Sequence, residues 1–322
     1  MRIVLLDQGA MEPKDQGDLD FSRLASTLPE WQAYETTADT QVAGRIATTT
    51  VAVSNKVCID DAAMGRAPHL RLICIAATGT NHVDLDAARR RGIAVCNVPG
   101  YATASVVQHV FALILALSTR LPDYQRALHA GRWQQGSQFC LLDYPIREIA
   151  GKTLGIIGYG ELGQAVARVA EAFGMTVKVA HYREGQPITG KIRVLLAELL
   201  PQVDILSLHC PLTPETRNLI GEQALALMRP DALLINTARG GIVDETALAA
   251  ALCQGKLGGA GVDVLTQEPP AQGNPLLAAN IPNLILTPHI AWASREARQR
   301  LVDEVAANIQ AFLEGGIRHR VA

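Results

Sequence analysis

Residues 155–174, GIIGYGELGQAVARVAEAFG, combine three closely spaced glycines with the apolar periodicity of a helix. Gly158, Gly160 and Gly163 form a G-x-G-x-x-G pattern directly after the apolar run at 152–157, KTLGII. In a strand–turn–helix unit these glycines permit a tight turn, let the backbone approach a pyrophosphate and let the helix pack closely on the sheet. The helix N-terminus then offers free N–H groups and a positive dipole end to the phosphates. A plain glycine-rich turn is the alternative, and the context favours dinucleotide binding.

Short apolar runs alternate with helical stretches on both sides of this motif. Strands are predicted at 2–6, 51–54, 71–77, 92–99, 152–158, 176–180, 204–209, 232–236, 259–264 and 284–288. Helices are predicted between them, including 84–92, a buried helix at about 102–120 and a long C-terminal helix at 294–316. This alternation indicates an α/β fold whose parallel sheets are covered by helices on both faces.

Composition excludes several classes of protein. A chain of 322 residues is long enough for two domains, and the formal net charge is -2. The densest basic run, Arg89–Arg91, is more typical of a solvated helix end than of a binding patch, so no nucleic-acid partner is expected. The apolar run at 106–117 falls short of the ~20 residues that a membrane span needs, so no membrane partner is expected.

None of the six cysteines forms a Cys-x-x-Cys pair, and Cys74 lies in an apolar run. A reducing, cytoplasmic location is therefore expected.

Chemically distinctive residues follow successive predicted strands. His209 ends one strand, Arg239 follows another in LLINTARGG, Glu268 follows GAGVDV, and His289 follows LILTP. Ligands bind beyond the carboxyl ends of strands in open parallel sheets, so we expect Arg239, Glu268 and His289 to converge beside the cofactor. Alone, each has a plainer explanation: a surface turn, a loop acid and a structural histidine. Together they favour a functional site.

These three groups suit the reduction of a 2-oxo acid. Arginine grips a carboxylate with a planar, permanently charged fork. Histidine exchanges a proton with the carbonyl oxygen near neutral pH, and a neighbouring carboxylate orients the imidazole. Gly240 and Gly241, which follow Arg239, are expected to let its loop bend under the substrate.

Three segments of the C-terminal half resemble the signatures of the D-isomer-specific 2-hydroxyacid dehydrogenases. They are NTARGGIVDETAL at 236–248, GVDVLTQEPP at 261–270 and LTPHIAWAS at 286–294. The resemblance covers essentially the whole chain and implies two Rossmann-like domains. A flavodoxin-like substrate domain would comprise residues 1–98 and 291–322, with the cofactor domain, 99–290, inserted into it.

The resemblance also implies roles for individual residues and no bound metal. Arg239 would bind substrate, His289 would be the acid/base and Glu268 would support it, whereas Thr78 and Gly79 would hold the substrate carboxylate. Besides the three motif glycines, the implied cofactor contacts are Thr103, Glu161, Leu162, His181, Tyr182, Arg183, His209, Pro211, Thr216, Thr237, Ala238, Asp263 and His289.

The phosphate state of the cofactor stays open between NAD and NADP. An acid that binds the adenosine ribose is expected after the second strand of the cofactor domain, but His181 stands there, followed by Tyr182 and Arg183. Arg183 suits the additional phosphate of NADP, so acceptance of NADP is slightly favoured. Gln108 also replaces the family's usual glutamate, which we expect to affect packing only.

Within the family, the segments at 77–85, 209–221 and 289–301 look most like glycerate dehydrogenases, that is, hydroxypyruvate or glyoxylate reductases. The predicted activity is hydride transfer between NAD(P)H and a small 2-oxo acid or D-2-hydroxy acid. The alternatives are another 2-hydroxyacid specificity and a non-catalytic NAD(H)-sensing protein of the same fold.

The resemblance implies a homodimer formed through the cofactor domain. The irregular segment 128–145 is either an arm that packs on a neighbour, which we prefer, or a surface connection.

Overall fold

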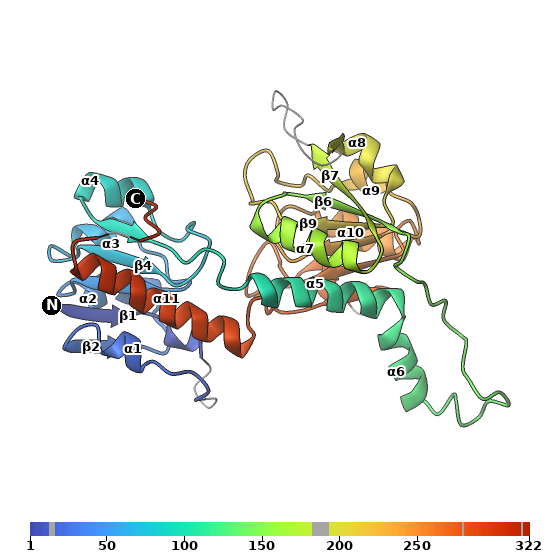
Figure 1. Ribbon diagram of the computed structural model, residues 1–322, viewed down its shortest axis with the longest axis horizontal. Helices are drawn as coiled ribbons and strands as arrows, with labels where there is room; N and C mark the ends of the chain where they lie inside the picture. Colours follow the sequence, from blue (N-terminus) through green and yellow to red (C-terminus); the bar gives the residue numbers. More distant parts are fainter. Residues whose placement is uncertain (13–16, 182–192, 279, 317) are drawn as a thin grey trace. The chain divides into compact units, whose positions relative to one another are not determined.

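The computed structural model describes residues 1–12, 17–181, 193–278, 280–316 and 318–322, which form two compact units (Figure 1). Unit 1 comprises Met1–Ala102 and Trp292–Ala322, and unit 2 comprises Thr103–Ala291. The chain therefore passes between the units after Ala102 and after Ala291. The boundaries predicted from the sequence fall after residues 98 and 290.

Unit 1 contains a five-stranded parallel sheet in the order β2-β1-β3-β4-β5, the flavodoxin-like order. Its strands are β1 (Arg2–Leu5), β2 (Glu30–Ala33), β3 (Val51–Ser54), β4 (Leu72–Ile75) and β5 (Ala94–Cys96). Its helices are α1 (Ser22–Ala25), α2 (Asp39–Ile46), α3 (Asp61–Gly65), α4 (Leu85–Arg91) and α11 (Arg295–Leu313), with a 3-10 turn at Gln8–Ala10.

Both faces of the unit 1 sheet are buried along β1, β3, β4 and β5, because alternate residues of these strands enter two separate apolar clusters. On β1, for example, Val4 joins one cluster, whereas Ile3 and Leu5 join the cluster under α11. Cys74 on β4 is fully buried in the second cluster, and desolvation raises the pKa of its thiol. A buried thiol at this position agrees with the apolar run in which Cys74 lies.

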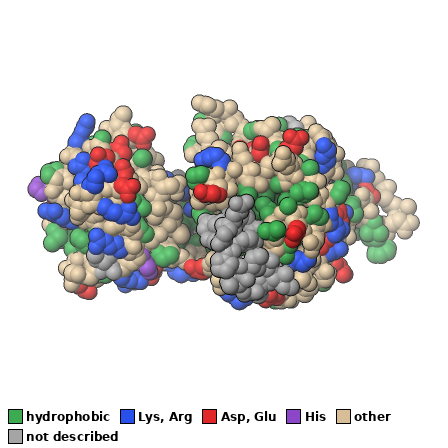
Figure 2. All heavy atoms as spheres, turned by 90° about the horizontal axis from the view of Figure 1, so that it is seen from above, with side chains coloured by type: hydrophobic (Ala, Val, Ile, Leu, Met, Phe, Trp, Pro, Cys, Tyr) green, Lys and Arg blue, Asp and Glu red, His purple; other side chains and the backbone are tan. Residues whose placement is uncertain are grey.

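The basic run Arg89–Arg91 forms the last turn of α4, and the helix ends at Gly92 in the left-handed conformation (φ 67°). Arg89 pairs with Asp86, and Arg91 pairs with Asp61 at 2.7 Å. These side chains are largely exposed, as expected for a solvated helix end. Basic and acidic side chains are interspersed over the surface that Figure 2 shows.

Unit 2 contains a seven-stranded parallel sheet in the order β12-β11-β10-β9-β6-β7-β8. Its strands are β6 (Thr153–Ile157), β7 (Thr176–His181), β8 (Arg193–Leu195), β9 (Ile205–Leu208), β10 (Leu233–Asn236), β11 (Gly259–Val262) and β12 (Leu284–Leu286). Six of them follow the 3-2-1-4-5-6 order of dinucleotide-binding folds, and β12 extends the sheet. The strand order reverses between β6 and β9, where that fold binds its ligand.

The helices of unit 2 are α5 (Thr103–Ser118), α6 (Leu121–His129), α7 (Glu161–Ala172), α8 (Leu196–Leu199), α9 (Glu222–Leu227) and α10 (Glu245–Cys253). Further 3-10 turns lie at Leu200–Gln202 and Pro275–Leu277. The predicted two-domain α/β fold is confirmed. The short strands β2 and β8 and several short helices were not predicted.

The α5 helix packs against β10 and β11, and more than half of its residues are buried. Arg120, in the left-handed conformation (φ 56°), separates α5 from α6. Among the described residues, no single helix is long and apolar enough to cross a membrane; α5 and α6, bent by 59°, satisfy only the length and composition criteria as a pair.

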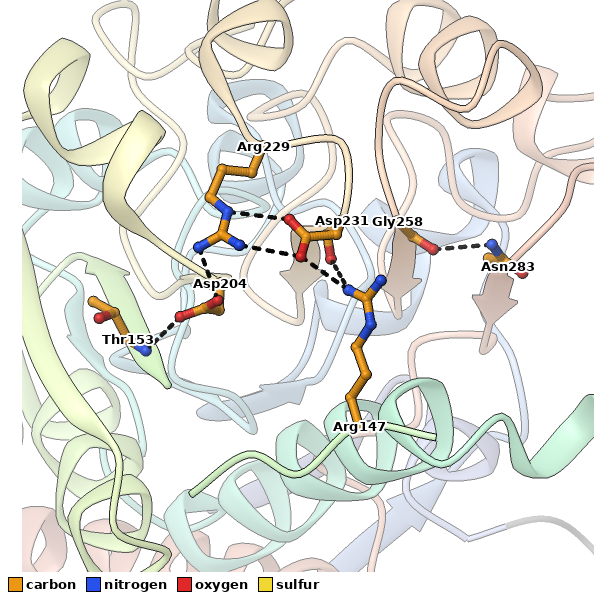
Figure 3. A network of polar contacts seen from close by, with 7 residues as sticks. All are labelled: Arg147, Thr153, Asp204, Arg229, Asp231, Gly258 and Asn283. Atoms are coloured by element: carbon orange, nitrogen blue, oxygen red, sulfur yellow. Dashed lines mark hydrogen bonds and ion pairs between the residues drawn. The ribbon is translucent and has the colours of Figure 1, made fainter. Parts of the chain in front are cut away.

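A polar network joins the amino-terminal ends of the unit 2 strands (Figure 3). Asp204 precedes β9 and accepts a hydrogen bond from the backbone N–H of Thr153, the first residue of β6, at 2.8 Å. Arg229 bridges Asp204 and Asp231, with each N···O distance at 3.1 Å. Arg147 donates to the backbone oxygen of Asp231 at 3.0 Å. A cavity of about 300 Å³ borders this network, at the edge of the sheet opposite the glycine motif.

Candidate functional site

The glycine motif joins β6 to α7 in a turn that has no space for side chains at two positions. A Cβ on Gly158, whose φ is 91°, would lie 2.5 Å from the backbone nitrogen of Cys210. A Cβ on Gly163 would lie 2.1 Å from the carbonyl oxygen of Gly158. At Gly160, by contrast, a Cβ would meet nothing within 4 Å, so the backbone there faces open space. This space fits a pyrophosphate, since α7 begins at Glu161 and the first N–H groups of a helix have no partner within it.

Two buried polar atoms beyond neighbouring strands have no partner within the described part of the chain. They are Oγ1 of Thr237, just after β10, and Nδ1 of His209, just after β9. Burial lowers the pKa of His209 to about 4, so its imidazole is neutral at pH 7. Its Nε2 lies 2.9 Å from Oγ of Ser207, which fixes the ring. Buried polar groups normally find a partner, so these two atoms fit a site whose ligand completes them.

Two other predicted cofactor residues, Thr216 and Thr103, make side-chain hydrogen bonds that stabilise the segments around them. The Thr216 hydroxyl is fully buried, donates to the carbonyl oxygen of Pro211 at 2.7 Å and accepts from the backbone N–H of Thr213 at 2.7 Å. Thr103, the first residue of α5, donates to Oε1 of Glu161 at 2.6 Å and so connects the starts of α5 and α7. The roles of these residues towards a cofactor stay predictions.

The turn that carries Arg239 is fixed by Asn236, the last residue of β10, for which no role was predicted from the sequence. The Asn236 amide is buried, accepts from the backbone N–H of Ala238 at 3.1 Å and donates to the carbonyl oxygen of Arg239 at 3.0 Å. Arg239 is partly exposed, and its Nη1 donates to the carbonyl oxygen of Ala238 at 2.6 Å. An asparagine that ends a strand before an arginine is the sequence signal for such a turn.

Backbone contact joins the Arg239 loop to the loop that carries Glu268. A Cβ on Gly240 would lie 1.9 Å from the carbonyl oxygen of Leu265, so the two loops touch through their main chains. The Leu265 N–H in turn donates to Oε1 of Glu268 at 2.8 Å. Gly240 is therefore required by close approach, whereas Gly241 has the positive φ (76°) expected of a bend. Both glycines lie in a turn, as expected, and the close approach is an additional requirement at Gly240.

Glu268 and His289 form a close pair, although 21 residues separate them in the sequence. Oε2 of Glu268 lies 2.6 Å from Nδ1 of His289, and the side chains are 34% and 26% exposed. An ionised carboxylate only accepts hydrogen bonds, so Nδ1 carries the proton of the neutral imidazole. The pair therefore sets Nε2 as the nitrogen that exchanges a proton with a ligand.

Asp263 fixes the loop that carries His289. Its buried carboxylate accepts from Oγ1 of Thr287 at 2.5 Å and from the backbone N–H groups of Ile290 and Ala291, both at 2.9 Å. The His289 N–H donates to the Asp263 carbonyl oxygen at 2.8 Å, and His289 itself has a φ of 56°. A non-glycine residue in this conformation persists only where its surroundings hold it.

In unit 1, Thr78 and Gly79 lie in the loop after β4. Oγ1 of Thr78 donates to the carbonyl oxygen of Val98 at 2.9 Å, and the Thr78 carbonyl oxygen accepts from Nδ2 of Asn97 at 2.8 Å. Within the described ranges, the N–H groups of Gly79 and Thr80 donate no hydrogen bond. Such free N–H groups suit a carboxylate, and they keep this loop a candidate substrate site.

His181 ends β7, whereas Tyr182 and Arg183 lie outside the described residues. The choice between NAD and NADP, which depends on these residues, therefore stays a prediction. Among the residues that the structure describes, no cluster of three His, Cys, Asp or Glu side chains is arranged to hold a metal ion.

Comparison with known proteins agrees with this geometry. Residues 111–291 match the NAD binding domain of the D-isomer specific 2-hydroxyacid dehydrogenases. The chain is 45% identical to the glycerate dehydrogenase of Methylorubrum extorquens, over 94% of this chain and 95% of that protein. It is 38% identical to the hydroxypyruvate reductase of Blautia hydrogenotrophica, over 98% of both.

A solved structure gives the same result at the level of the fold. The NADPH-dependent glyoxylate/hydroxypyruvate reductase of Sinorhizobium meliloti, in complex with NADP and malonate, matches with a TM-score of 0.81 and 30% identity. The match covers 100% of this chain and 96% of that one. The glycine loop, the Glu268–His289 pair and these matches together show that the chain belongs to the D-isomer specific 2-hydroxyacid dehydrogenase family.

Proposed function

We propose that this dehydrogenase reduces a small 2-oxo acid, hydroxypyruvate or glyoxylate, to the D-2-hydroxy acid. The observation that carries the proposal is the Glu268–His289 pair at 2.6 Å, held within the same unit as the glycine loop. The named relatives act on glycerate, hydroxypyruvate and glyoxylate, which supports this choice of substrate. The reaction also runs in reverse, with the hydroxy acid as the donor.

The chain's own residues bind the acid and move one proton. A bound NAD(P)H supplies the hydride. His289 gives the proton on Nε2 to the carbonyl oxygen, and Glu268 then stabilises the state in which Nδ1 remains protonated. Arg239 binds the substrate carboxylate through its guanidinium. Unit 2 is the cofactor domain and unit 1 the substrate domain in this proposal.

The cofactor assignment follows from the same residues. The open space at Gly160 and the start of α7 at Glu161 support a dinucleotide pyrophosphate. The family model is an NAD binding domain, and the Sinorhizobium meliloti relative is NADPH-dependent. With His181 in place of the usual acid, we propose that both reduced cofactors are accepted.

Specificity constants test this proposal directly. The purified protein is assayed at 340 nm with hydroxypyruvate, glyoxylate and pyruvate, each with NADH and with NADPH. The expected result is that hydroxypyruvate or glyoxylate has the highest kcat/KM. A highest value for pyruvate would overturn the substrate assignment. If no oxo acid oxidises either cofactor, the protein is a nicotinamide sensor instead.

We also propose a cytoplasmic homodimer in which the segment after α6 packs on a second copy. This segment leaves unit 2 as an extended arm (Figure 1). Phe139 and Leu142 on it are 89% and 78% exposed, and Trp133 and Ile146 are about half exposed. Exposed apolar groups of this size on one segment are typical of a surface that a partner covers.

Molar mass in solution tests the dimer. Light scattering is expected to give twice the chain mass of 34.5 kDa for the parent protein. The double variant Phe139→Ser, Leu142→Ser removes apolar area from the arm, so we expect it to shift the mass towards one chain. The control Leu277→Ser removes another exposed apolar side chain, outside the arm. A parent protein of single-chain mass would contradict the proposal.

A further inference from the structure

His109 on α5 is a polar residue in an apolar helix, and it contacts the loop that carries His289. Its side chain is 18% exposed, and its Nε2 lies 3.0 Å from Oγ1 of Thr287 and 3.6 Å from Oδ1 of Asp263. Both partners belong to unit 2, as His109 does. His109 therefore contacts Thr287 and Asp263, the side chains that hold the His289 loop, but not the loop's catalytic residue itself.

The hydrogen-bond directions in the series His109, Thr287 and Asp263 follow from which groups carry a proton to donate. An ionised Asp263 only accepts, so the Thr287 hydroxyl must donate its single proton to Oδ1 at 2.5 Å. Thr287 Oγ1 then has only lone pairs left for His109. Nε2 of His109 must therefore carry a proton and donate it to Thr287. The order is His109 to Thr287 to Asp263, with every donor used once.

The same carboxylate holds the backbone of the catalytic loop. Asp263 accepts from the N–H groups of Ile290 and Ala291, the two residues after His289. A donor on His109 keeps the Thr287 hydroxyl directed at Asp263. The remaining lone pairs of the carboxylate then accept from those two N–H groups. Hydrogen bonds in such a partly buried series strengthen one another.

We propose that His109 is a positioning residue, which fixes the placement of His289 through Thr287 and Asp263 without touching the substrate. The inference rests on the proposed function, because it concerns the acid/base of that reaction. It predicts that removal of the donor at position 109 displaces His289 from its partner Glu268. Displacements of this kind lower turnover more than they weaken binding.

The kinetic test compares His109→Leu, which removes the donor, with His109→Gln, which keeps an N–H donor. We expect kcat to fall about 10- to 100-fold in His109→Leu, with smaller changes in KM and in cofactor affinity. His109→Gln is expected to recover most of this loss. The matched control is Gln108→Ala, at the adjacent exposed position of α5, with parental kinetics. Equal losses in His109→Leu and His109→Gln would overturn the proposal.

A double-mutant cycle tests whether the effect passes through Thr287. In a Thr287→Val background the hydroxyl is already absent, so adding His109→Leu is expected to lower kcat less than about twofold further. Full additivity of the two losses would show that His109 acts by another route, and the proposal would fail.

Hydrogen–deuterium exchange gives a readout that does not depend on activity. The N–H groups of Ile290 and Ala291 are expected to exchange faster in His109→Leu than in the parent, His109→Gln or Gln108→Ala. If the parent protein reduces no oxo acid, the proposed function fails, while this exchange still decides the role of His109. Unchanged exchange in His109→Leu would refute the role whatever the activity.

Discussion

Replacing His289 with glutamine is expected to lower kcat by about 100- to 10,000-fold, the range for loss of a positioned general acid. Glutamine can still donate a hydrogen bond, but it cannot give up a proton near neutral pH. The Glu268 carboxylate, now 2.6 Å from Nδ1 of His289, would face an amide that does not become charged. Cofactor affinity should change little, because the glycine loop after β6 and the start of α7 are untouched.

Steady-state kinetics and fluorescence titration with NADH and NADPH separate these two effects. The matched control is His69→Gln, which makes the same substitution at an exposed histidine outside both candidate sites. It should retain parental turnover. Equal losses of turnover and of cofactor affinity in His289→Gln would argue against proton transfer and for a role in binding the cofactor.

Much of the fold follows from patterns that a single sequence carries. The apolar runs that became β6, β9, β10 and β11 are buried on both faces, so they are continuous and easy to recognise. The strands β2 (Glu30–Ala33) and β8 (Arg193–Leu195) lie at the sheet edges, and β2 is only partly buried. Neither strand has a long apolar run: β2 alternates polar and apolar residues over only four positions, and β8 has three residues. Their place depends on pairing with a neighbour rather than on their own sequence.

The residues of the candidate site also fall into two groups, those that could be predicted from the sequence and those that could not. Arg239, Glu268 and His289 could be predicted because each follows a recognisable strand and the ends of parallel strands share one edge. The residues that hold them could not be predicted. Asn236 has the last position of a strand, and His109 lies beside Gln108 within a largely apolar helix. Their roles arise from hydrogen-bond partners up to 178 residues away, and no local pattern encodes these.

Gly240 is the position where three-dimensional contact changes the interpretation most. The sequence suggests a flexible bend, but a Cβ there would lie 1.9 Å from the Leu265 carbonyl oxygen and 2.5 Å from the Thr266 nitrogen. Both obstacles are backbone atoms, so no side-chain rotation relieves the clash. The Thr266 N–H is also tied to Oε1 of Glu245 at 2.6 Å, which limits how far its loop can retreat.

Substituting Gly240 with alanine is therefore expected to force the Arg239 and Glu268 loops apart. Overpacking of this kind costs about 1–3 kcal/mol of unfolding free energy, measured by denaturant titration. The value of kcat/KM should fall by more than the loss of unfolding free energy alone would cause. The Leu265 N–H that binds Glu268 would move, and a displacement of about 1 Å at a catalytic group can lower kcat/KM by about 100-fold.

The control is Gly44→Ala, because a Cβ on Gly44 in α2 meets nothing within 4 Å and alanine favours the helix. It should keep full activity and equal or greater stability. If Gly240→Ala instead retained parental kcat/KM, the two loops would not be in backbone contact. The Arg239 loop and the Glu268 loop would then lose the direct backbone connection described above.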